Sequence, residues 1–301
     1  MKAKFLERCD ALGLPARLSD DFESIHGPVA YWIRNRIVST PHPFFLGVNG
    51  AQGSGKSTFS DLLATILREM GHNVVVCSID DFYLTREARE QLAQNIHPLC
   101  LHRGVPGTHD IALAVETFDK LIKAKDSDVT PIPRFDKARD DRMDIDDWDR
   151  VEGSVDVVIF EGWCVGASDL PAWTSPYNER EKKEDPNGTW CKWSRQALID
   201  RYSELFGYLN ALLMIRIPSM ETVHRSRWLQ ESKLWKKHEE TNNKETLKGL
   251  MTKEQTRLYV QLFERLTEHM LEAMPAKADI LIQCGESFDY ALTRLPNAST
   301  D

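Results

Sequence analysis

Five short runs of apolar residues, rich in β-branched side chains, recur along the chain at residues 44–48, 74–79, 155–160, 211–217 and 279–283. Apolar runs of this length are typical of strands that are buried on both faces of a parallel sheet. Between the first two runs, apolar residues recur at helical spacing up to Gly71, where a helix is expected to stop. The pattern therefore predicts an α/β fold. We expect a five-stranded parallel sheet with helices on both faces and functional residues at the carboxyl ends of its strands.

A glycine-rich string follows the first predicted strand directly. Residues 50–57 read GAQGSGKS and match GxxxxGK[ST] at every fixed position, and a helix is expected to open near Lys56. In this motif the glycines let backbone N–H groups point at phosphates, the lysine reaches the β- and γ-phosphates, and the next hydroxyl binds Mg²⁺. A chance glycine-rich turn is the alternative, but both flanks fit the motif. The sequence thus predicts a site for ATP and Mg²⁺, with Ser57 as a metal ligand and the nucleotide held by Gly50, Ala51, Gln52, Gly53, Ser54, Gly55, Lys56, Ser57 and Thr58.

Acidic residues stand at the ends of the second and third predicted strands. Asp80 and Asp81 follow the second strand, and Glu161 follows the third. A carboxylate near the phosphate loop can accept the proton of an acceptor hydroxyl or orient that hydroxyl toward the γ-phosphate. Glu161 is the natural candidate for holding Mg²⁺, directly or through water. The alternatives are a solvated Asp-Asp turn and a strand-terminal glutamate in an unrelated polar contact.

The composition and the absent motifs argue against several classes of protein. The formal charge of −8 and the isoelectric point near 5.7 argue against a dedicated nucleic-acid binder, because phosphate backbones are held by clustered Lys and Arg. The six cysteines are scattered and indicate reduced thiols, and neither a signal-peptide core nor a membrane span is expected. The NKxD segment of GTPases and the LSGGQ signature of transporter ATPases do not occur. These features favour a cytoplasmic kinase for a small molecule, with no nucleic-acid or membrane partner and with a monomer as the favoured state.

Four strings behind the phosphate loop carry a resemblance to a known family. They are DDFY at residues 80–83, HRGVPGTHD at 102–110, PRFDK at 133–137 and FEGW at 160–163. In this order they resemble the glycerate kinase family, typified by the plant D-glycerate 3-kinase and including bacterial and fungal P-loop kinases. The similarity covers roughly residues 40–165 and extends more distantly to uridine kinase, phosphoribulokinase and pantothenate kinase. It implies a P-loop kinase fold with a helical lid, and it implies that Asp80 matches the catalytic carboxylate of those relatives.

The resemblance also implies where the acceptor binds. Tyr83, Arg103, His109, Arg134 and Lys137 lie where the related kinases bind acceptors. A small hydroxylated acid such as D-glycerate needs cationic or N–H donors there for its carboxylate. Arg134 can clamp a carboxylate through two parallel hydrogen bonds, whereas Lys137 cannot. The alternative is that these charges line a solvated loop or pair with nearby aspartates.

Asp81 is expected to play a different part from its neighbour. Adjacent side chains on an extended strand point to opposite faces, so with Asp80 at the acceptor, Asp81 faces the neighbouring loop or a water bound to Mg²⁺. It is therefore the third predicted metal residue, beside Ser57 and Glu161.

Beyond the fourth strand, residues 221–235 predict a helix that carries Arg225 and Arg227. An arginine brought over the phosphates by a closing lid would offset developing charge, so both are predicted catalytic residues beside Lys56 and Asp80; the alternative is that they only decorate a helix. We expect residues 1–301 to form one domain. Its parts are a helical extension at 1–40, a nucleotide- and acceptor-binding core at 41–165, an insertion at 166–196, and the lid helix and last strands at 197–301.

The leading hypothesis is direct in-line transfer of the γ-phosphate of ATP to D-glycerate, giving 3-phospho-D-glycerate without a covalent enzyme intermediate. One alternative keeps this mechanism and changes the acceptor to pantothenate, a nucleoside or a sugar phosphate. Another is a regulatory nucleotide-binding ATPase without a metabolite acceptor. Asp80 and the loop at residues 103–110 favour the kinases.

Overall fold

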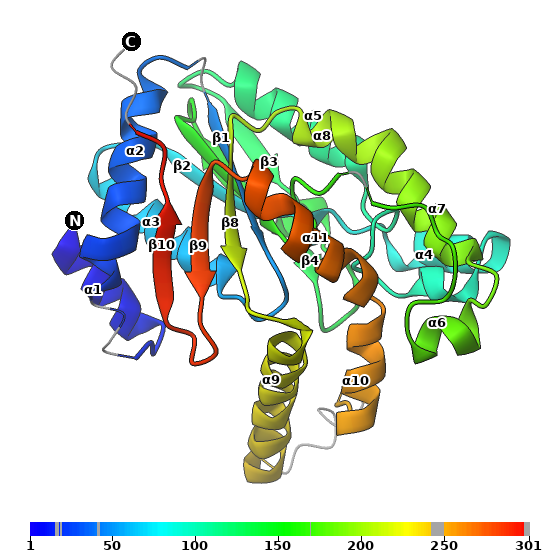
Figure 1. Ribbon diagram of the computed structural model, residues 1–301. Coiled ribbons are helices and arrows are strands. Elements are labelled where there is room, and N and C mark those ends of the chain that lie inside the picture. The colour runs from blue at the N-terminus through cyan, green and yellow to red at the C-terminus, as the bar shows by residue number, and fades with distance from the viewer. Residues whose placement is uncertain (16–17, 19, 41–42, 169, 242–249, 298–301) are drawn as a thin grey trace.

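A central six-stranded sheet organises the molecule in the computed structural model, which describes residues 1–15, 18, 20–40, 43–168, 170–241 and 250–297 (Figure 1). The strand order is β10-β9-β8-β1-β7-β2. Neighbours among β2, β7, β1, β8 and β9 run parallel, and β10 pairs antiparallel with β9. The strands are β1 (Phe44–Gly50), β2 (Val74–Ser78), β7 (Val157–Gly162), β8 (Ala211–Arg216), β9 (Ile280–Cys284) and β10 (Tyr290–Arg294).

The five predicted parallel strands are confirmed as β1, β2, β7, β8 and β9. The hydrophobic pattern does not predict β10. This strand lies at the edge of the sheet, where all five of its residues are half-buried or exposed, so it lacks a continuous apolar run. The sheet therefore has one more strand than the sequence indicates, and that strand is antiparallel.

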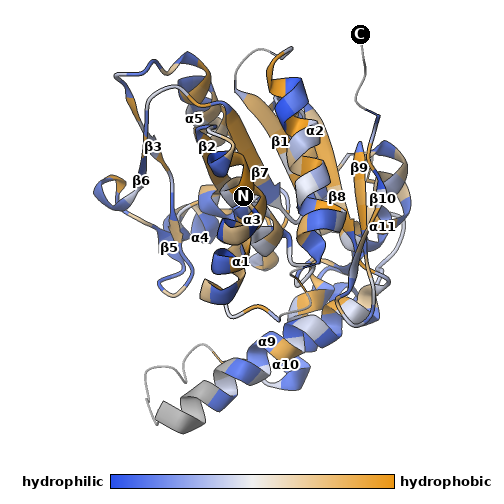
Figure 2. Ribbon diagram, turned by 90° about the vertical axis from the view of Figure 1, so that its left-hand side faces the viewer, coloured by the Kyte–Doolittle hydropathy of each residue, from blue (hydrophilic) through white to orange (hydrophobic). Residues whose placement is uncertain are grey.

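Side chains on the two faces of the sheet belong to two separate hydrophobic cores. In β1, Phe44, Leu46 and Val48 belong to one core and Phe45 to the other, as the period of a strand requires. Figure 2 shows the resulting apolar strands between helices whose outer faces are polar. One face is covered by α1 (Lys2–Ala11), α2 (Gly27–Ile37) and α3 (Lys56–Glu69), the other by α5 (Ile111–Lys123), α7 (Thr189–Ala197), α8 (Ser203–Phe206) and α11 (Glu264–Lys277).

Two helices project together from the edge of the sheet where the parallel strands end (Figure 1). They are α9 (Met220–Thr241), which contains the predicted lid helix, and α10 (Lys253–Gln261). None of the helices in the described part of the chain has the length and apolar character needed to cross a bilayer.

Several short elements lie outside the central sheet. Two antiparallel hairpins precede β7, and they pair β3 (Val129–Ile132) with β6 (Asp149–Glu152) and β4 (Phe135–Asp136) with β5 (Asp141–Arg142). The helix α4 (Arg86–Asn95) follows the segment after β2, and α6 (Glu179–Glu184) lies in the predicted insertion. The insertion packs on the rest of the molecule, since the Ser194 hydroxyl donates a 2.9 Å hydrogen bond to the Pro106 carbonyl.

Candidate functional site

The phosphate loop joins β1 to α3 at the carboxyl edge of the sheet. Gly53 and Gly55 have φ angles of 77° and 84°, which glycine adopts without strain. A Cβ on Gly53 would lie 2.6 Å from Cβ of Ser226 in α9, and a Cβ on Gly55 would lie 2.6 Å from the Tyr290 hydroxyl in β10. The loop is thus enclosed by the lid helix and the edge strand. It leads into the N-terminus of α3 at Lys56, the end of a helix that attracts anions.

Ser57 and Glu161 meet beside the loop. The Ser57 hydroxyl donates a 2.7 Å hydrogen bond to Glu161 Oε1, and the Lys56 ammonium lies 3.9 Å from Oε2. Glu161 is only 6% exposed, and no described residue donates a hydrogen bond to Oε2. A hydroxyl and a carboxylate oxygen are the hard ligands that Mg²⁺ prefers, with its remaining positions left to water and phosphate. The residues present therefore fit the metal that the motif implies.

Asp80 lies just after β2 and is held by two neighbours. The Tyr83 hydroxyl donates a 2.7 Å hydrogen bond to Oδ1, and Lys137 Nζ lies 2.7 Å from Oδ2. Burial by itself raises the pKa of Asp80, but the charges of Lys137 and Lys56 and the two hydrogen bonds together bring this pKa down to about 2. Asp80 is therefore an anion at neutral pH, within electrostatic reach of the phosphate-loop lysine.

Asp81 has a structural partner. β2 ends at Ser78 and Ile79–Phe82 form a 3₁₀ turn, so the prediction of an extended strand at this point is wrong. Asp81 Oδ2 accepts a 3.0 Å hydrogen bond from the Ser78 N–H and lies 2.6 Å from Arg134 Nη1. Arg134 also pairs with Asp149 at 2.6 Å. Asp81 and Arg134 therefore each have a charged protein partner in this structure, and the metal and acceptor contacts predicted for them stay predictions.

Two further cations lie near Asp80. Lys137, which pairs with it, remains 61% exposed. Arg103 pairs with Asp140, and its guanidinium lies 5.4 Å from the centre of the Phe135 ring. The alternative of pairing with a nearby aspartate therefore holds for Arg103. Lys137 is the more exposed of the two and the better placed to meet a ligand.

His109 and Tyr83 form an aromatic wall next to Asp80. Their rings stack with centroids 4.7 Å apart. The Tyr202 hydroxyl accepts a 2.8 Å hydrogen bond from the Gly107 N–H and lies 2.6 Å from His109 Nδ1. This contact holds the His109 ring beside Tyr83. Burial lowers the pKa of His109 to about 4, so the ring is neutral at pH 7.

Both lid arginines are engaged in this structure. Arg225 donates a hydrogen bond to the backbone carbonyl of Glu286, in the loop between β9 and β10. Arg227 pairs with the buried Glu231 at 3.0 Å, and its guanidinium lies 5.7 Å from the centre of the Tyr259 ring. The catalytic role predicted for the two arginines therefore requires that they leave these partners.

Three tyrosines near the site are not predicted as site residues by the sequence. Tyr202 and Tyr290 have the contacts described above, and Tyr259 of α10 packs edge-on against Phe263 with ring centroids 5.2 Å apart. Burial raises the pKa of Tyr259, and the nearby Arg103 guanidinium opposes that rise. All three lie outside the recognisable motifs, where a single tyrosine in a helical or edge-strand pattern gives no signal of a site.

Comparisons with known proteins identify P-loop kinases that are similar to this chain. The model of the KAP family P-loop domain matches residues 28–128. The uncharacterized kinase mug58 of Schizosaccharomyces pombe is 35% identical over 199 residues, which cover 64% of this chain and 71% of that protein. The chloroplastic D-glycerate 3-kinase of Arabidopsis thaliana is 32% identical over 192 residues, covering 62% of this chain but 40% of the plant protein. The D-glycerate 3-kinase structure from Cryptococcus neoformans shares the fold, with a TM-score of 0.65 at 21% identity over 88% of this chain and 97% of that one.

Proposed function

The chain belongs to the D-glycerate 3-kinase family of P-loop kinases, and from this premise we propose that it transfers the γ-phosphate of ATP to the 3-hydroxyl of D-glycerate. Membership of the family makes it an ATP-dependent phosphotransferase with an alcohol group as acceptor. The choice of D-glycerate is supported by the plant relative of that name, which is 32% identical over the matched residues.

The observation that carries the proposal is the placing of Asp80 between two lysines. Lys137 lies 2.7 Å from its carboxylate, and the charge of Lys56 in the phosphate loop acts on it as well. A small hydroxylated acid offers a hydroxyl and a carboxylate a few atoms apart. We expect Asp80 to receive the hydroxyl, and the exposed Lys137, whose ammonium has three donors, can bind the acceptor carboxylate while it stays paired with Asp80.

In the proposed reaction, a bond forms between the acceptor oxygen and the γ-phosphorus as the bond to the β–γ bridging oxygen breaks. Lys56 offsets the charge on the β- and γ-phosphates. Ser57 and Glu161 are the residues that would hold Mg²⁺, which when bound neutralises charge on the same phosphates. Because the pKa of Asp80 is about 2, this carboxylate orients the hydroxyl and accepts its proton only late, before the proton passes to water.

ADP release with ATP and Mg²⁺ tests the proposal. The acceptor panel is D-glycerate, L-glycerate, pantothenate, uridine and ribulose 5-phosphate, and the product is identified by its mass. D-glycerate should stimulate ADP release and gain one phosphoryl group at its 3-hydroxyl. If only another acceptor stimulated ADP release, the protein would still be a kinase but its substrate would not be D-glycerate. Slow hydrolysis that no metabolite stimulates would instead support a regulatory ATPase.

A further inference from the structure

We call residues 102–110 the acceptor loop, because they carry Arg103 and His109, two of the predicted acceptor residues. The loop contains neither a helix nor a regular strand. Gly104 and Gly107 have φ angles of 121° and 99°, which glycine adopts without strain. The position of the loop therefore depends on contacts with neighbouring elements as well as on its own hydrogen bonds.

The insertion at residues 166–196 supplies several of these contacts. The ring of Trp193 lies so close to Gly107 that a Cβ on this glycine would be 2.6 Å from it. The Ser194 hydroxyl donates a 2.9 Å hydrogen bond to the backbone carbonyl just before Gly107. The insertion thus packs against the middle of the acceptor loop, and a side chain of α6 contacts its first residue.

That side chain is Arg180. Its Nη2 lies 3.1 Å from Nε2 of His102, and its Nη1 donates a 2.9 Å hydrogen bond to the Leu258 carbonyl in α10. A guanidinium only donates hydrogen bonds, so Nε2 of His102 is the acceptor and the ring is neutral. Burial and the charge of Arg180 lower the pKa of His102, which favours this neutral form. Arg180 therefore joins the start of the acceptor loop to α10.

The next residue of the loop continues the link toward Asp80. Arg103 pairs with Asp140, and its Nη2 donates a 3.4 Å hydrogen bond to the backbone carbonyl of Lys137. The ammonium of Lys137 lies 2.7 Å from Oδ2 of Asp80. A displacement of His102 therefore moves Arg103 and, with it, the backbone that carries Lys137.

We propose that Arg180 is a positioning residue for the acceptor, because it fixes Lys137 beside Asp80 by way of His102 and Arg103. This inference rests on the proposed function, in which Lys137 binds the acceptor carboxylate. A misplacement of about 1 Å at a reacting site can cost about 10²-fold in rate, so a link of this kind affects acceptor binding without touching the acceptor. The insertion then contributes to the acceptor site as well as to the packing of the molecule.

Steady-state ADP release with D-glycerate and ATP tests the role of Arg180. Arg180→Ala should raise the KM for D-glycerate about tenfold and leave the KM for ATP unchanged, since the phosphate loop keeps its contacts. Arg180→Lys keeps the charge but loses the planar fork that reaches both partners, so its KM should lie between those of Arg180→Ala and the wild type. Arg257→Ala is the matched control. Arg257 pairs with Glu179 of α6 at 2.9 Å and with Glu254 of α10 at 2.8 Å, and its loss should change neither KM.

The partner on the acceptor loop gives an independent test. His102→Leu removes the acceptor of the Arg180 hydrogen bond and should raise the KM for D-glycerate as Arg180→Ala does. His102→Gln offers an amide oxygen in place of Nε2 and should keep the KM near that of the wild type. The double variant Arg180→Ala/His102→Leu should be no worse than either single variant, because both substitutions break one link.

The outcomes separate a positioning role from a structural one. A lower Tm in Arg180→Ala with both KM values unchanged would overturn the inference, because Arg180 would then only hold α6 to α10. Additive effects of Arg180→Ala and His102→Leu on the KM would overturn it as well. If Arg180→Ala fails to fold, as judged by circular dichroism, equal KM values for His102→Leu and His102→Gln would have the same force. If D-glycerate does not stimulate ADP release by the wild-type protein, the proposed function fails, and this result is distinguished by appearing without any substitution.

Discussion

Replacing Asp80 with Asn removes the charge at the centre of the proposed acceptor site and preserves the shape of the side chain. The amide can still accept the hydrogen bond that the Tyr83 hydroxyl donates at 2.7 Å. It can no longer pair with Lys137 at 2.7 Å or take the proton of an acceptor hydroxyl. The expected result is a fall in kcat with little change in ATP affinity, because the phosphate loop and the Ser57–Glu161 pair are untouched.

The size of the loss follows from the pKa of Asp80. Loss of a general base typically costs about 10² to 10⁴ in rate, or about 3 to 5 kcal/mol of transition-state stabilisation. A carboxylate with a pKa of about 2 is a weak base, so we expect the lower part of that range, with most of it lost orientation. The stability that Asp80 gains from ionisation is present above pH 3.8 and is lost only as the pH falls toward about 2. Asp80 should therefore add no acid limb to a kcat profile measured between pH 5 and 8.

Asp81→Asn is the matched control. It leaves Arg134 with Asp149 as its carboxylate partner and should cost about 1 to 3 kcal/mol of stability, seen as a lower Tm, with a milder effect on kcat. The measurements are steady-state ADP release with D-glycerate, calorimetric ATP binding and thermal unfolding. The reasoning is refuted if Asp81→Asn cripples kcat at an unchanged Tm while Asp80→Asn is nearly as active as the wild type.

Three other substitutions give sharp outcomes. Arg134→Lys should lower Tm without changing either KM, because the guanidinium lies between two aspartates; a raised KM for D-glycerate alone would restore its predicted acceptor role. Tyr202→Phe removes the hydroxyl that lies 2.6 Å from His109 Nδ1 and holds this ring in place, so it should raise the KM for D-glycerate several-fold with the KM for ATP unchanged; a loss of Tm with no KM change would count against this. His26→Phe should flatten the acid dependence of stability. The pKa of His26 is about 4 in the folded state against 6.5 in the unfolded state, so the stability that the neutral ring contributes is present above pH 6.5 and is lost as the pH falls toward 4. In urea unfolding of the wild type this loss should amount to about 2 kcal/mol between pH 7.5 and 5.0. If the free energy of unfolding of the variant fell as steeply with pH as that of the wild type, the assignment would be contradicted.

Local features of the sequence determined much of the fold and the nucleotide end of the site. The five parallel strands are runs of apolar residues, and the phosphate loop is a continuous string whose chemistry depends on neighbours in the chain. The contact between Ser57 and Glu161 was also predictable. Ser57 lies in the segment that follows β1, Glu161 lies at the end of the neighbouring strand β7, and parallel strands end at one edge of the sheet.

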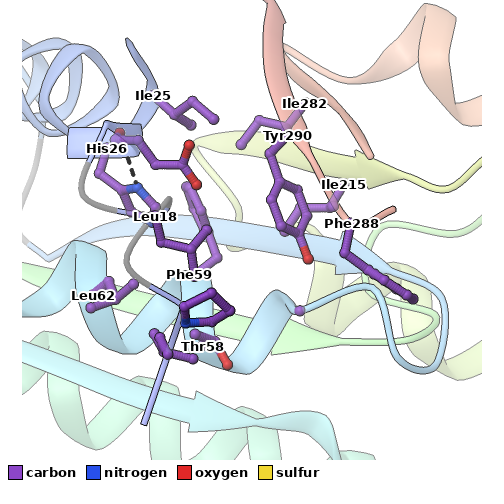
Figure 3. Close-up of a pocket in the computed structure, with 14 residues that line it drawn as sticks. Leu18, Ile25, His26, Thr58, Phe59, Leu62, Ile215, Ile282, Phe288 and Tyr290 are labelled. Atoms are coloured by element: carbon purple, nitrogen blue, oxygen red, sulfur yellow. Dashed lines mark hydrogen bonds between the residues drawn. The ribbon is translucent and has the colours of Figure 1, made fainter. Parts of the chain in front are cut away.

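Only the tertiary structure decided which charged side chains pair with one another and which elements enclose the phosphate loop. Arg134 pairs with Asp81 across 53 residues, and the Tyr290 hydroxyl reaches the Ser54 carbonyl across 236. No periodicity links such positions, since each contact depends on how separate elements pack. The apolar cavity of about 210 Å³ between residues 14–26, α3 and β10 has the same origin (Figure 3). Residues 14–26 and β10 each pack apolar side chains against α3 and the sheet, and the space between them exists only once both have packed.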